Sequence, residues 1–147
     1  MRKGEIFKKE NILVGASVSD WKEAVRAAGG VLEAAGSATS RYTEEMVAAV
    51  EEMGPYMVIL PKLALAHAAP SGAVLRNDVS LVTLKEPVRF GSENDPVHVV
   101  LCICCTDRES HREALQRIAR MVMDEDIVDR LAAAASVEEI LSVAEGY

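Results

Sequence analysis

The sequence predicts a single α/β domain in which a mixed β-sheet is flanked by helices on both faces. Two helical patterns come first along the chain, a group of β-branched runs follows, and three helical patterns end it. The chain has 147 residues, of which 50% are hydrophobic and 27% charged, a composition typical of a globular domain with one core. We therefore expect residues 1–147 to form one domain.

Two amphipathic helices are predicted before the strands. Apolar residues at three- and four-residue spacing predict a helix over residues 21–35, which Ser17 or Ser19 would cap and Gly36 would end. The same spacing predicts a second helix over residues 41–53. Both helices would bury one apolar face.

Short apolar runs in the middle of the chain predict the strands. Residues 79–84 and 97–104 are rich in β-branched side chains, and residues 56–60 are predicted to form a buried strand. Residues 63–69 lie between two prolines and are predicted to be a short extended piece that leads into a loop. A small strand over 88–90 is expected within the polar connection.

Three helices are predicted after the last strand. Asp107 would cap the first of them, which carries apolar residues at helical spacing from Ala114 to Val122. A shorter helix is predicted near residues 127–134. The capping box Ser136-x-x-Glu139 then opens the last helix.

Charge, hydropathy and cysteine content exclude several classes of protein. The net charge of −7 argues against a nucleic-acid partner, because proteins that grip phosphate backbones carry a basic surplus. No stretch approaches the roughly 20 apolar residues of a membrane span, and the N-terminal residues lack the apolar core of a secretory signal. The three cysteines fall within residues 102–105, which is no disulfide framework. We therefore expect a cytoplasmic protein that does not insert into a membrane.

His67 is the first candidate for chemistry. It lies among small residues between Pro61 and Pro70, a setting that favours an accessible loop. An imidazole is largely neutral at pH 7, and one ring nitrogen is then free to act as a nucleophile. A surface histidine without a role is the alternative interpretation.

His111 is the second candidate. It falls in the first turn of the helix that Asp107 opens, and it shares the inward side of Ala114 and Leu115. A strand that ends near Cys105 and a helix that begins at once form a corner of the kind that holds anionic ligands in α/β folds. An exposed first-turn histidine without a role is again the alternative.

A metal site is considered for His98, Cys102 and Cys104, which share one face of a predicted strand. At about 3.3 Å per residue, positions 98 and 102 lie roughly 13 Å apart and the two cysteines about 7 Å apart. Both spacings are too long for one ion with Zn–S bonds near 2.3 Å. The cysteines are interpreted as small buried hydrophobic side chains, and neither a metal nor a cofactor is expected.

Taken together, these segments resemble a known family. The motif Pro61-x-Leu-Ala-Leu-Ala-His67, the N-terminal pair of helices and the motif Asp107-x-x-x-His111-x-x-x-Leu115 are similar to the enzyme IIA domain of the bacterial sugar phosphotransferase system, in its mannitol/fructose superfamily. The segments Met123-Asp-x-x-Ile127 and Ser136-x-Glu-Glu139 are also typical of that family. The resemblance extends over residues 12–143.

The resemblance implies a phosphotransferase with a phosphohistidine intermediate. His67 would accept a phosphoryl group from the carrier protein HPr and pass it to an enzyme IIB, which serves a membrane enzyme IIC in sugar uptake. His111 would hydrogen-bond the phosphoryl oxygens or the ring, together with backbone N–H groups at the start of its helix. Four small residues would form a shallow apolar rim where the two partners dock in turn: Ala64, Ala66, Ala68 and Ala69.

Two departures from the mannitol and fructose branches suggest an ascorbate-type member. Ala66 replaces the proline that precedes the histidine in those branches, and Ala49 stands about where their second helix carries an arginine. Residues 54–59 and the pair Ala69-Pro70 resemble the ascorbate branch instead.

Several questions stay open at this stage. Lys62 and Arg76 are both candidates for the cation that neutralises the phosphoryl group. A regulatory IIA-like module that is phosphorylated without a role in transport is one alternative function. A metal-dependent hydrolase that uses His67, His111 and Asp107 is an alternative from another class. The sequence does not name the sugar, and a homodimer is left open.

Overall fold

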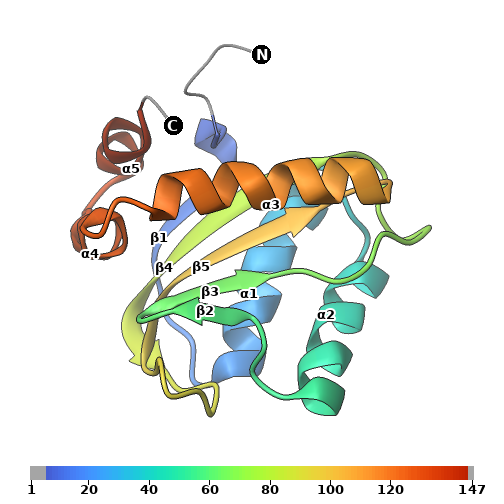
Figure 1. Ribbon diagram of the computed structural model, residues 1–147, viewed down its shortest axis with the longest axis horizontal. Helices are drawn as coiled ribbons and strands as arrows, with labels where there is room; N and C mark the ends of the chain where they lie inside the picture. Colours follow the sequence, from blue (N-terminus) through green and yellow to red (C-terminus); the bar gives the residue numbers. More distant parts are fainter. Residues whose placement is uncertain (1–5, 146–147) are drawn as a thin grey trace.

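A five-stranded mixed sheet lies between two helical layers in the computed structural model, which describes residues 6–145 (Figure 1). The strands follow the order β1-β4-β5-β3-β2 across the sheet. β1 pairs with β4, and β3 pairs with β5, in parallel, whereas β4–β5 and β2–β3 are antiparallel. The bounds are β1 (Ile12–Ala16), β2 (Val58–Leu60), β3 (Leu63–Ala66), β4 (Asp78–Val88) and β5 (Val97–Cys104).

The helices divide between the two faces of this sheet, as the sequence predicts. A short 3-10 helix, η1 (Lys9–Asn11), precedes β1. One face is covered by α1 (Trp21–Ala34) and α2 (Ser40–Met53). The other is covered by α3 (Arg108–Val122), α4 (Ile127–Ala133) and α5 (Val137–Ala144) (Figure 1). Within the described residues no helix is long and apolar enough to cross a membrane.

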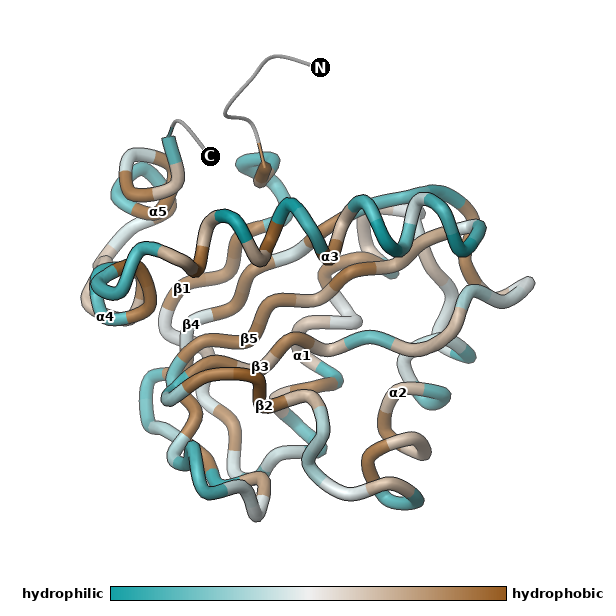
Figure 2. Tube along the Cα trace, in the orientation of Figure 1, coloured by the Kyte–Doolittle hydropathy of each residue, from teal (hydrophilic) through white to brown (hydrophobic). Residues whose placement is uncertain are grey.

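The alternation of side chains along the strands divides the core into two halves. On β3, Ala64 and Ala66 pack toward α1 and α2, whereas Leu63 and Leu65 pack toward α3, α4 and α5. All four side chains are buried, and Figure 2 shows hydrophobic residues concentrated along the central strands. Residue 67 continues the odd-numbered series of residues 63 and 65, so the alternation along β3 directs its side chain toward the layer that contains α3.

Several details differ from the sequence-based expectations, beginning with strand β1, which the sequence does not predict. Asp20 caps α1 by accepting a hydrogen bond from the Glu23 N–H (2.9 Å), whereas Ser19 donates to the Glu23 carboxylate and Ser17 caps nothing. Strand β4 runs on to Val88, so no separate strand forms over 88–90. β2 is an edge strand rather than a buried one, and Ile59 is 39% exposed.

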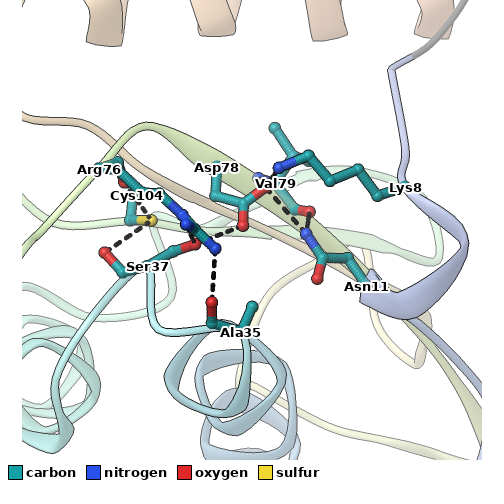
Figure 3. Close-up of polar contacts among 8 residues, drawn as sticks. All are labelled: Lys8, Asn11, Ala35, Ser37, Arg76, Asp78, Val79 and Cys104. Carbon is teal, nitrogen blue, oxygen red and sulfur yellow. Dashed lines mark hydrogen bonds and ion pairs between the residues drawn. The ribbon is translucent and has the colours of Figure 1, made fainter.

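A buried carboxylate ties the N-terminal segment to the sheet (Figure 3). The Asp78 side chain, at the start of β4, accepts hydrogen bonds from Asn11 (2.8 Å), Ser37 and the Val79 N–H (2.9 Å), and the Lys8 ammonium lies 3.6 Å away. Burial alone would raise the pKa of Asp78, but these hydrogen bonds and the charge of Lys8 outweigh it and lower the pKa below its ordinary value. Ionised Asp78 therefore stabilises the folded state.

We expect Asp78→Asn to lower the free energy of unfolding by about 1–3 kcal/mol at pH 7, the usual cost of a lost charge-assisted hydrogen bond. Because the pKa is lowered in the folded state, this contribution is present above the unfolded pKa of about 3.9 and is lost as pH falls through the folded pKa. Urea unfolding of both proteins at several pH values measures it. Asp129→Asn, which breaks an exposed ion pair with Lys62, is the control and should cost less than about 1 kcal/mol. Equal stability of Asp78→Asn and wild type at pH 7 would contradict this account.

Candidate active site

The parallel pairing of β3 and β5 brings the two candidate histidines together. Ala66, the last residue of β3, is paired with Cys102 near the end of β5, so both strands end at the same edge of the sheet. His67 follows β3 directly, and His111 lies in the first turn of α3, which follows β5. Their ring centroids are 5.6 Å apart with planes inclined by 45°. The third histidine, His98, lies near the start of β5, at the opposite edge.

A single hydrogen bond defines the protonation of His67. The ring Nδ1 lies 2.7 Å from the carbonyl oxygen of Leu65. A carbonyl oxygen only accepts, so Nδ1 carries the hydrogen, and the neutral ring keeps its lone pair on Nε2. The side chain is half-buried, and Nε2 is the nitrogen through which this ring can act as a nucleophile.

His111 has the complementary arrangement. Its Nδ1 is buried and has no hydrogen-bond partner within residues 6–145. A buried N–H without an acceptor is rarer than a buried acceptor without a donor, so the hydrogen belongs on Nε2. Burial, and secondarily the proximity of His67, lower the pKa of His111 below its ordinary value. The ring is therefore neutral at pH 7 and has one N–H to donate.

The two rings together form a nucleophile beside a hydrogen-bond donor. If an electrophilic group with negatively charged oxygens were bonded to Nε2 of His67, those oxygens would lie close to the adjacent His111 ring. The backbone at the start of α3 offers less than the sequence suggests. The Ser110 N–H is bound by the Asp107 carboxylate (2.7 Å), and the His111 N–H is bound by the Asp107 carbonyl (3.1 Å). The His111 side chain is therefore a better hydrogen-bond donor at this corner than the backbone N–H groups of Ser110 and His111.

Tyr42 and Tyr56, to which the sequence analysis assigns no role, contact the loop that follows β3. The Tyr56 ring meets the His67 ring edge-on, with centroids 5.3 Å apart, and its hydroxyl donates to the His67 carbonyl oxygen (2.9 Å). The Tyr42 hydroxyl, on α2, accepts from the Ala68 N–H (3.0 Å). Apolar periodicity places both tyrosines in predicted core elements, and nothing in that pattern indicates where a hydroxyl points.

The cations proposed from sequence have other partners. Lys62 precedes β3 whereas His67 follows it, so the two lie at opposite ends of that strand, and the Lys62 ammonium pairs with Asp129 (2.8 Å). The Arg76 guanidinium donates to the Ser37 hydroxyl (2.9 Å) and to the Ala35 carbonyl (Figure 3). Neither side chain is directed by these contacts toward the histidine pair.

The expected rim of small residues is also smaller than predicted. Ala64 and Ala66 are fully buried between the sheet and the helices α1 and α2, because they occupy the inward positions of β3. Ala68 is half-buried, and Ala69 is exposed. Of these four alanines, the two that follow the histidine are therefore the ones open to a docking partner.

The cysteines are buried, as expected from the strand pattern. All three are free thiols, and Cys102 and Cys104 are fully inaccessible. Among residues 6–145 no group of three or more histidine, cysteine or acidic side chains is placed to hold a metal ion. Asp107, the carboxylate of the hydrolase alternative, is instead engaged as the cap of α3.

A mixed sheet between two helical layers, with two histidines adjacent where β3 and β5 end, defines the class of protein to compare, and comparison with known proteins gives its family. The family described as "Phosphoenolpyruvate-dependent sugar phosphotransferase system, EIIA 2" matches residues 5–146. The ascorbate-specific PTS system EIIA component of Escherichia coli K12 is 34% identical over 140 residues, which cover 94% of this chain and 91% of the relative. This chain therefore belongs to the EIIA type 2 family, whose members are phosphotransferases that carry a phosphoryl group.

Solved structures agree with this assignment. The mannitol-specific cryptic phosphotransferase enzyme IIA CmtB of Escherichia coli superposes with a TM-score of 0.87 at 26% identity, covering 98% of both chains. The enzyme IIAMTL of Escherichia coli, solved in complex with phosphorylated enzyme IIBMTL, gives a TM-score of 0.82 at 28% identity and covers 94% of this chain and 96% of that chain. The resemblance inferred from the sequence motifs is thus confirmed.

The histidine pair yields a direct prediction about titration. We expect the pKa of His111 in the folded protein to lie below 6.5, because protonation would bury a second N–H without an acceptor beside another imidazole. NMR titration of the histidine ring protons measures it, with the urea-unfolded chain as reference. His67→Ala should move the pKa part of the way back, since burial remains. A folded-state pKa at or above the unfolded value would contradict this geometry.

Proposed function

We propose that this chain is an ascorbate-type enzyme IIA that receives a phosphoryl group on Nε2 of His67. The donor is the phosphohistidine of HPr, and the acceptor is an enzyme IIB that serves a membrane enzyme IIC. Residues 1–147 act as one EIIA domain in the cytoplasm. The observation that carries the proposal is the Nδ1 hydrogen bond of His67 to Leu65, which leaves Nε2 as a nucleophile beside His111.

The proposed step conserves protons on the ring. The Nε2 lone pair attacks phosphorus, the P–N bond of the donor breaks, and its electron pair returns to the donor nitrogen. The hydrogen stays on Nδ1 throughout, donated to the carbonyl oxygen of Leu65. In transfer to the enzyme IIB, a nucleophile of that partner attacks phosphorus, the bond between phosphorus and Nε2 of His67 breaks, and its electron pair returns to Nε2. Phosphoryl transfer passes through a loose transition state, which needs positioning and charge stabilisation. The neutral His111 N–H supplies charge stabilisation to the phosphoryl oxygens.

Two observations favour ascorbate among the sugars of this family. The curated relatives that share 34–35% identity over 140 residues are ascorbate-specific components. The substitution of Ala49 for the arginine of the mannitol and fructose branches indicates the same branch, as does the Gly54-Pro-Tyr56 stretch. The structural neighbour bound to a phosphorylated enzyme IIB supports the choice of downstream partner.

Phosphorylation of the purified protein tests the roles of both histidines. We expect phosphorylated HPr to add one phosphoryl group to wild type, none to His67→Ala, and one to His111→Ala at a rate at least about tenfold lower, the usual loss when one charge-stabilising donor is removed. Intact mass spectrometry under rapid quench measures this. His98→Ala, at the opposite edge of the sheet, is the matched control and should behave as wild type. Undiminished labelling of His67→Ala would refute the acceptor.

Onward transfer tests the transport role and the branch. We expect the phosphorylated protein to donate to an ascorbate-type enzyme IIB faster than to a mannitol-type enzyme IIB, with single-turnover transfer of radiolabelled phosphate as the measurement. A protein that is labelled but transfers to neither enzyme IIB would instead be a regulatory module. Preference for the mannitol-type partner would contradict the ascorbate assignment alone.

A further inference from the structure

The peptide group between His67 and Ala68 is held at both ends by tyrosine hydroxyls. Its carbonyl oxygen, on His67, accepts from the Tyr56 hydroxyl at 2.9 Å. Its N–H, on Ala68, donates to the Tyr42 hydroxyl at 3.0 Å. The Tyr42 hydroxyl in turn donates to the carbonyl oxygen of Ile103 on β5 (2.8 Å). One peptide plane directly after the histidine is thus fixed from two different elements.

Both hydroxyls are suited to this role because each keeps its proton. Burial raises the pKa of Tyr42 above its usual range, and burial also raises the pKa of Tyr56. Tyr42 is fully buried, and its bond to Ile103 ties the loop to the strand that leads into α3. Tyr56 is half-buried and follows α2, so it can be replaced with less damage to the core.

Tyr56 also restrains the histidine ring itself. Its ring stands at 85° to the His67 ring with centroids 5.3 Å apart, an edge-on arrangement that aromatic pairs prefer. His111 contacts the same ring at a centroid distance of 5.6 Å. Two rings therefore contact the imidazole while its Nδ1 donates to the Leu65 carbonyl. Rotation of the ring about χ2, which would exchange Nδ1 with Cδ2 and Nε2 with Cε1 and so break the hydrogen bond to Leu65, is opposed by the ring contacts and the hydrogen bond alike.

We propose that Tyr56 is a positioning residue for phosphoryl transfer, which keeps the His67 imidazole in place beside His111 by holding both the peptide and the ring of that histidine. This rests on the proposed function of His67. Tyr56 neither takes nor gives a proton in the step, and the P–N bond is made and broken at Nε2 as described above. Its contribution is geometric, and displacement of a reacting atom by about 1 Å can cost as much as 100-fold in rate.

Two substitutions separate the hydroxyl from the ring. Tyr56→Phe keeps the ring and removes the hydrogen bond to the His67 carbonyl, so we expect the single-turnover rate of labelling by phosphorylated HPr to fall about 3- to 10-fold. Tyr56→Leu removes both contacts and should lower it about 10- to 100-fold. The apparent affinity for phosphorylated HPr should change less than twofold in Tyr56→Phe. Trp21→Phe, which alters the aromatic contact with Phe90 elsewhere in the core, is the control for general destabilisation and should keep the wild-type rate.

A spectroscopic readout distinguishes positioning from stability. In ¹⁵N-histidine NMR of the unphosphorylated protein, wild-type His67 should show the single tautomer with hydrogen on Nδ1, and Tyr56→Leu should show a mixture of the two tautomers. Wild-type rates with the Nδ1–H tautomer retained in both variants would overturn the proposal, as would a loss confined to the affinity for HPr. If Tyr56→Leu does not fold, the rate and tautomer of Tyr56→Phe decide. Absence of labelling in wild type would refute the proposed function instead, while the tautomer shift would still test Tyr56.

Discussion

The parallel pairing of β3 with β5 is the constraint on which the site depends. Two adjacent strands that run in the same direction end at the same edge of the sheet, so the segments that follow them must meet. One strand delivers a loop with His67, and the other delivers the first turn of α3 with His111. Because β3 alternates Ala toward one layer and Leu toward the other, the residue after it faces the α3 layer. Packing of a four-residue strand thus sets the direction of the candidate nucleophile.

In the proposed phosphoryl site, the direction of the hydrogen bonds takes the place of the charged groups found in many phosphate sites. A carbonyl acceptor fixes the hydrogen of His67 on Nδ1, and the buried Nδ1 of His111, which has no partner in the part of the chain that the structure describes, places the hydrogen of that ring on Nε2. The Lys62 and Arg76 side chains bind elsewhere, so neither cation is directed toward this pair of rings. A neutral nucleophile next to a neutral donor favours transfer in both directions, because neither state of the carrier is held by a strong ion pair.

The sequence predicts the architecture well and the site only in part. Helical periodicity places α1 to α5 within a few residues, and the motifs at His67 and His111 suffice for the family. β1 is not predicted, because it is a five-residue edge strand with the sequence Ile-Leu-Val-Gly-Ala, in which apolar and polar residues do not alternate. The hydrogen bonds of the Tyr42 and Tyr56 hydroxyls are also not predictable from the sequence, because periodicity assigns a tyrosine to the core without indicating which group its oxygen contacts. The sequence alone leaves Lys62 a candidate cation for the site. The structure argues against it, because β3 lies between Lys62 and His67.

The central claim is that phosphorus bonds to one particular nitrogen while a hydrogen stays on the other. The most direct measurement is ³¹P–¹⁵N correlation NMR of the ¹⁵N-histidine-labelled protein, phosphorylated through HPr and kept at alkaline pH to slow hydrolysis. The account predicts one phosphorus resonance coupled to Nε2 of His67, whose Nδ1 still carries a hydrogen bonded to the Leu65 carbonyl. Phosphorus coupled to Nδ1, or to a nitrogen of His111 or His98, would contradict it.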